Sequence, residues 1–183
     1  MSSFTITNLK KYLNNMSKEE LIVEIADIVK QYPDIKEYYT AKLDPKYEEI
    51  AFEKYKKIIT NEFFPDRGFG MLRYSVVNKA IKDFCKISNN TVLISKLMLY
   101  YVGIGVEFTD TYGDIDEKFY NAIAKAYDKA SDYITKHDLQ EIFIEEADSI
   151  RESTGHMGWG FPIIMDEIFY NYFDADVEEE ENE

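Results

Sequence analysis

The sequence predicts an all-α protein of seven to nine helices, and three observations support this fold class. Apolar residues recur at intervals of three and four along most of the chain, which is the period of an amphipathic helix. Only 8 Gly and 4 Pro occur in 183 residues, fewer than a loop-rich sandwich or propeller uses. Hydrophobic residues make up 45% of the chain, enough to build a core. We therefore expect a compact multi-helix bundle, and an arrangement of stacked helical pairs is left open.

The first part of the chain contains clear signals for the start of a helix. Ser17 followed by Glu20 is a capping box, and apolar residues at helical spacing come directly after it. Pro33 and Pro45 each suit the first turn of a further helix. The second of these helices should continue to about Pro65.

The middle of the chain contains its most apolar segment. A helix over 71–86 is followed by Asn90 and Thr91, either of which can cap the next helix. Residues 92–102 are apolar nearly all round, as in a helix buried at the centre of a bundle. Residues 102–108 alternate well enough for a short strand, but we favour a helix because the neighbouring segments are helical.

The last part of the chain contains three further helical segments. A turn is predicted at 109–114, and an apolar stripe then runs over 115–134. A second stripe over 139–150 predicts a helix that stops near Gly155. Residues 161–173 should form the last helix of a single all-helical domain that spans 1–173.

The charge of the chain is strongly acidic and argues against two classes of partner. Asp and Glu total 35 against 21 Lys and Arg, which gives a formal net charge of -14. Many of these acids lie in the last ten residues, so we expect 174–183 to be a disordered acidic tail. A negative field repels phosphate groups, and we therefore expect neither nucleic acid nor an anionic membrane as a partner.

The cysteine content and the apolar segments predict a cytoplasmic protein. A single cysteine, Cys85, excludes an intramolecular disulfide, and we expect it to be a buried, inert thiol. The N-terminus lacks the basic and apolar regions of a signal peptide. The most apolar segment, 92–108, carries Lys96 and Glu107 and falls short of the ~20 apolar residues of a membrane span.

The common catalytic and metal-binding motifs are missing from the sequence, so we lean against an enzyme. The only two histidines, His137 and His156, are too far apart for a helical metal-binding pair. There is no phosphate-binding loop and no nucleophile-elbow motif, and we expect no cofactor or metal. The acidic segment 109–117 fails the calcium-loop spacing, and helix capping by Asp114 or Asp116 is the simpler interpretation.

Two loops contain residue types that often bind ligands or partners. The segment GHMGWG (155–160) surrounds the only tryptophan, Trp159, which would be a recognition anchor if exposed. The simpler interpretation folds Trp159 back into the core. Arg67 and Arg73 are two of only three arginines and could form a small cationic site. Internal salt bridges to the many carboxylates are the more ordinary explanation.

Several segments of the chain resemble an uncharacterised bacterial family, domain of unknown function 6155. The most similar segments are RGFGMLRYSVVNKAIKDF (67–84), LMLYYVGIGVEFTDTYGDIDEKFYNA (97–122) and GHMGWGF (155–161), and the likeness extends from about Leu9 to Phe173. This resemblance implies a compact helical bacterial protein but no activity. It also directs attention to the loops at 67–73, 110–114 and 156–160 as one set.

Three hypotheses for function follow from these observations. The first is a protein-binding or scaffold module, with a protein partner of unknown identity and an oligomeric state that the sequence does not give. The second is an enzyme or small-ligand-binding protein with a pocket formed by the three loops. The third is an acidic mimic of nucleic acid. The candidate binding residues are Arg67, Arg73, Tyr112, Asp114, His156 and Trp159.

Overall fold

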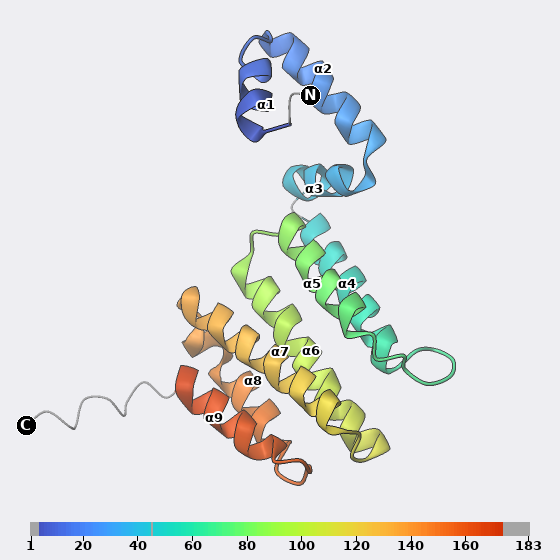
Figure 1. Cartoon of the computed structure of the whole chain (residues 1–183), viewed down its shortest axis with the longest axis vertical. Coiled ribbons are helices and arrows are strands. Elements are labelled where there is room, and N and C mark those ends of the chain that lie inside the picture. The colour runs from blue at the N-terminus through green and yellow to red at the C-terminus, as the bar shows by residue number, and fades with distance from the viewer. Residues whose placement is uncertain (1–3, 45, 174–183) are drawn as a thin grey trace, which may run out of the picture. The chain divides into compact units, whose positions relative to one another are not determined.

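A computed structural model describes residues 4–44 and 46–173, and these residues form nine helices and no strand (Figure 1). The predicted all-α fold class is therefore confirmed. The chain divides into two compact units, an N-terminal unit (Met1–Tyr47) and a C-terminal unit (Glu48–Glu183). The predictions for Pro45 and for the acidic tail at 174–183 fall outside the described residues. The single domain over 1–173 stays a prediction.

The N-terminal unit consists of three short helices whose starts follow the sequence signals. They are α1 (Ile6–Leu13), α2 (Lys18–Gln31) and α3 (Pro33–Leu43). The capping box of α2 is confirmed, since Ser17 Oγ accepts from the Glu20 N–H at 3.2 Å and Glu20 Oε2 accepts from the Ser17 N–H at 2.7 Å. Pro33 is the first residue of α3, as predicted. None of the three helices contains a buried residue.

The described part of the C-terminal unit contains six helices that run alternately up and down (Figure 1). Connections 64–73, 113–116 and 153–160 therefore lie at one end of the unit, and connections 88–90 and 137–139 at the other. The helices are α4 (Tyr47–Phe63), whose first residue belongs to the N-terminal unit, α5 (Tyr74–Ile87), α6 (Thr91–Tyr112), α7 (Glu117–Lys136), α8 (Gln140–Glu152) and α9 (Phe161–Phe173).

Helix α6 is the core helix of the C-terminal unit, and it packs against α5, α7 and α8. Asn90 caps it, because the Asn90 Oδ1 accepts from the N–H groups of Val92 and Leu93 at 3.1 and 3.2 Å. Residues 102–108 are helical, as we favoured. A Cβ atom on Gly105 would lie 2.4 Å from Ile123 Cδ1, so α6 and α7 approach each other closely at this glycine.

The predicted turn at 109–114 is wrong for most of its length, because α6 continues to Tyr112. The Thr111 hydroxyl donates to the Glu107 carbonyl at 2.9 Å, which satisfies it within the helix. The helix ends at Gly113, whose φ of 82° lies in the left-handed region that favours glycine.

The length and apolar character of α6 also correct the prediction that this segment is too short to span a membrane. Among the described helices it is the one long and apolar enough to cross a membrane by length and composition, whereas we expected 92–108 to fall short. Of its most apolar window, 56% is buried inside the protein, as in a core helix. The cytoplasmic location stays a prediction.

Three further details of the C-terminal unit differ from the sequence predictions. Helix α5 begins at Tyr74 rather than at 71, because Leu72 adopts a φ of 50° and its N–H donates to the Glu62 carbonyl at 3.0 Å. Helix α8 ends at Glu152, before the predicted stop at Gly155. Cys85 is exposed rather than buried. Desolvation still raises the pKa of its thiol above the usual 9.0, which lowers the fraction of thiolate at neutral pH.

Candidate functional site

The alternating direction of the six helices brings the three predicted loops to the same end of the C-terminal unit (Figure 1). We call this end the loop face and define it as residues 64–73, 110–116 and 153–160. Their proximity in space could not be measured from the order of the residues. Contacts between aromatic rings and between polar groups connect the three segments to one another.

A continuous series of aromatic contacts runs from the loop face into the core of the C-terminal unit. Neighbouring ring centroids are between 4.7 and 5.8 Å apart, in tilted or edge-to-face arrangements. Such ring pairs stabilise the folded protein beyond what the burial of their apolar surface provides. The series therefore joins the α4–α5 connection to the start of α9 through the core. In order, its rings are Phe69, Tyr112, Phe108, Phe119, Tyr120 and Phe161.

Asp114 connects two of the loops through its carboxylate. It accepts hydrogen bonds from the Tyr120 hydroxyl and, at 3.1 Å, from the Gly158 N–H. These two bonds hold the pKa of Asp114 below its usual value, the Tyr120 bond having the larger effect. Burial, followed by the bond to Asp114, raises the pKa of Tyr120 to about 12. The capping role belongs to Asp116, whose Oδ1 accepts from the Phe119 N–H at 2.7 Å.

His156 provides a second connection between the same two loops. Its Nε2 lies 3.0 Å from Oδ1 of Asp110, at the end of α6. Both side chains are exposed, so this contact adds little to the stability of the fold. The structure thus brings the predicted residues Tyr112, Asp114 and His156 into one connected region.

Arg73 is used inside the protein, as the salt-bridge interpretation predicted. Its backbone N–H and its Nε each donate to Oε2 of Glu62 at 3.0 Å, and its Nη2 donates to Oε1 at 2.6 Å. Glu62 is only 3% exposed, and the Arg73 guanidinium lowers the pKa of its carboxyl group. Arg67 is exposed in the same connection. The two arginines therefore have different environments, and Arg73 serves mainly to bind Glu62.

The prediction that Trp159 folds into the core is wrong, because its side chain is 60% exposed. Its φ of 60° places it in the left-handed region, which is strained for a residue with a side chain. Met157 occupies the inward position of this loop and is 6% exposed. The exposed apolar side chains of the loop face are Phe69, Met71, Tyr112 and Trp159.

Within residues 4–44 and 46–173, the structure contains no group of three or more His, Cys, Asp or Glu side chains placed to hold a metal ion. The acids of the predicted segment 109–117 have other roles. Asp116 caps α7, and Asp110 and Asp114 connect the loops.

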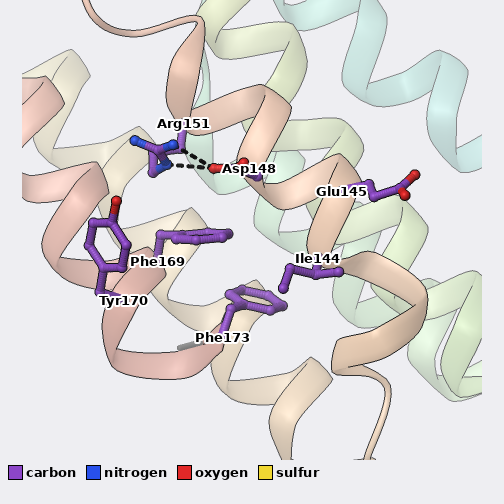
Figure 2. Close-up of a pocket in the computed structure, with 7 residues that line it drawn as sticks. All are labelled: Ile144, Glu145, Asp148, Arg151, Phe169, Tyr170 and Phe173. Carbon is purple, nitrogen blue, oxygen red and sulfur yellow. Dashed lines mark hydrogen bonds and ion pairs between the residues drawn. The ribbon is translucent and has the colours of Figure 1, made fainter. Parts of the chain in front are cut away.

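A groove between α8 and α9 is a second candidate site, which sequence reasoning missed (Figure 2). It has a volume of about 470 Å³, and we call it the α8–α9 groove. The sequence signal was Arg151, the one basic residue in a strongly acidic helix, but its contact with Asp166 on α9 could not be read from the sequence. The lining residues are Ile144, Glu145, Asp148, Arg151, Phe169, Tyr170 and Phe173.

The fold and these two sites define an all-α protein with an exposed aromatic loop surface and a groove between its last two helices. The chain belongs to the family described as family of unknown function (DUF6155), whose model matches residues 4–173. This confirms the resemblance identified from the sequence, and the family description names no activity. No curated protein and no solved structure matches the chain.

Proposed function

We propose that this protein is a protein-binding module, that its loop face is the docking surface, and that Trp159 is the central anchor. The observation that carries this proposal is the exposure of Trp159, at 60%, in a strained backbone conformation. Strained residues that their surroundings hold in place occur most often at functional sites. Tryptophan is also among the residues that contribute most to binding at protein interfaces.

The surroundings of Trp159 support docking of a protein more than binding of a small ligand. Phe69 and Met71 are 77% and 70% exposed, so apolar side chains extend outward from the surface. The polar groups that would hold a small ligand are already partnered, Arg73 by Glu62 and Asp114 by Tyr120 and Gly158. A docking surface of exposed side chains on firmly held loops suits a preorganised protein interface. We assign the module to the cytoplasm as part of the same proposal.

The test is affinity capture from a lysate of the cells that produce the protein, with the full chain and three variants as bait. Trp159→Ser and Phe69→Ser should each lose a partner that the unchanged chain retains. Ile142→Ser is the matched control, because Ile142 is 59% exposed on α8, outside the loop face. A partner that all three variants retain equally would contradict the proposal.

The fluorescence of the single tryptophan gives an independent measurement. In the free protein, acrylamide should quench Trp159 efficiently because the side chain is exposed. Once the captured partner is added, the quenching should fall strongly, since an anchor becomes buried on binding. Unchanged quenching in the complex would show that the partner docks elsewhere.

A further inference from the structure

The α8–α9 groove differs from the loop face because it is a hollow with an apolar floor. Phe169 and Phe173 are 7% and 8% exposed, and Tyr170 and Ile144 flank them at 51% and 37%. Figure 2 shows the aromatic side chains extending from α9 and the remaining lining residues from α8. Apolar area therefore lies at the bottom of the groove and along its sides.

The one cation of the groove is already neutralised. Nη2 of Arg151 lies 2.6 Å from Oδ1 of Asp148, and its Nη1 lies 2.8 Å from Oδ1 of Asp166. The guanidinium carbon lies 5.2 Å from the centroid of the Phe169 ring and 5.7 Å from that of Tyr170. Arg151 therefore fixes the positions of the aromatic rings and has little remaining capacity to bind an anion.

The two helices that form the groove have a strongly negative net charge. Figure 2 shows the Glu145 side chain directed away from Arg151, toward the outside of the groove. A partner that places apolar side chains on the floor would lie beside Glu145, on two helices of negative net charge, so charge complementarity favours a basic partner. Helices α8 and α9 carry one basic residue, Arg151, and seven acidic ones, Glu141, Glu145, Glu146, Asp148, Glu152, Asp166 and Glu167.

We propose that the α8–α9 groove binds a basic amphipathic helix of a partner protein. The lining residues of α8, from Ile144 to Arg151, follow about two turns of that helix, so the groove runs along the helix axis. A groove of this shape receives the apolar face of a helix, with side chains at i, i+3 or i+4, and i+7 as anchors. Lysines beside the apolar face of the partner helix would lie near Glu145 at the edge of the groove. This site is separate from the loop face and does not depend on the proposed function.

The test measures binding of a labelled Leu–Lys peptide of roughly 18 residues, about five helical turns, to the full chain at low salt. Fluorescence anisotropy should show binding that weakens as salt is added, because salt screens the charge attraction. A peptide with Glu in place of each Lys should not bind. Glu145→Lys and Tyr170→Ala should each weaken binding about tenfold, since they remove a rim charge and an apolar contact.

Two control variants separate the groove from general attraction to an acidic protein. Glu167→Lys makes the same charge change as Glu145→Lys, on α9 but outside the groove lining, and should change binding less than about twofold. Trp159→Ser should leave peptide binding unchanged, which keeps this result distinct from a failure of the loop-face proposal. Equal weakening by Glu167→Lys and Glu145→Lys, or unchanged binding by Tyr170→Ala in a variant with the normal melting curve, would overturn the groove proposal.

Discussion

The two compact units are built from similar amphipathic helices but bury their side chains to very different extents. In α2, Ile22 and Val23 are 57% and 60% exposed, and the described part of the N-terminal unit has no buried residue. In the C-terminal unit, Leu97 and Ile123 are completely buried. A helical apolar stripe therefore predicts a helix, but burial of that stripe needs further layers of helices against which it can pack.

The two units also differ in charge. Residues 1–47 contain seven basic and seven acidic side chains, so the net charge of -14 belongs entirely to residues 48–183. The electrostatic arguments against nucleic acid and anionic membranes therefore apply to the C-terminal unit alone. The proposed basic partner of the α8–α9 groove is consistent with this distribution.

The largest expected difference between the units is in amide hydrogen exchange. Amides in the middle of α6 should exchange at least about a hundredfold more slowly than those in the middle of α2, because little tertiary packing opposes local opening of α2. Exchange of the full chain followed by mass spectrometry measures both helices in one experiment. Equal protection of the amides in α2 and α6 would show that the N-terminal unit is covered in solution. The proposed difference in burial between the two units would then be wrong.

A matched pair of substitutions tests the same contrast in stability. Ile123→Ala in α7 should lower the free energy of unfolding by about 4 kcal/mol, because Ile123 is completely buried against α6. Ile28→Ala in α2 should lower it by about 1 kcal/mol or less, because Ile28 is only partly covered. Denaturant unfolding of both variants provides the measurement. Similar losses would mean that the two units share one core.

A smaller loss of stability is expected when the contact of Glu62 with Arg73, which joins the loop face to the core, is removed. Glu62→Gln should lower the free energy of unfolding by about 2 kcal/mol, because it removes charge-assisted hydrogen bonds from a buried group. Glu53→Gln is the matched control, since Glu53 is exposed on the same helix. Equal losses in the two variants would contradict this prediction.

The stabilisation that Glu62 provides should decrease as the pH falls. Arg73 holds the pKa of Glu62 below its usual 4.5 in the folded protein, so the unfolded chain takes up the proton more readily. The stabilisation is fully present above about pH 4.5 and is lost as the pH falls through the lower, folded-state pKa. Unfolding measured between neutral and acidic pH should therefore show a smaller difference between the unchanged chain and Glu62→Gln as the pH falls.

Local signals in the sequence predicted much of the fold. Helix caps act within a few residues, so the neighbouring residues in the sequence are sufficient to identify them. Examples are the capping box of Ser17 and Glu20 and the cap at Asn90. The last helix was predicted at its observed bounds, 161–173. The end of α6 was misplaced because Thr109 and Thr111 favour turns in isolation, whereas in this helix their hydroxyls donate to helical carbonyls.

The candidate sites were predicted less completely because they depend on contacts between distant segments. The contact of Asp114 with Gly158 joins two separate connections, and the pairing of Glu62 with Arg73 joins the end of α4 to the end of the connection that follows it. No spacing rule predicts either contact. Trp159 was placed in the core from the usual burial of tryptophan, but in this loop Met157 is the buried side chain and Trp159 is exposed. The α8–α9 groove requires knowledge of which helices are neighbours.

The unequal connections at the two ends of the C-terminal unit have an evolutionary consequence. At the end opposite the loop face, helices are joined by the short segments 88–90 and 137–139, whereas 64–73 and 153–160 are longer. Long surface connections accept insertions and substitutions far more readily than tight turns or packed helices. If the loop face is the docking surface, as we propose, related chains could change what they bind at this end while the helical scaffold stays almost unchanged. Under the same proposal, relatives whose loops differ in length would be expected to bind different partners.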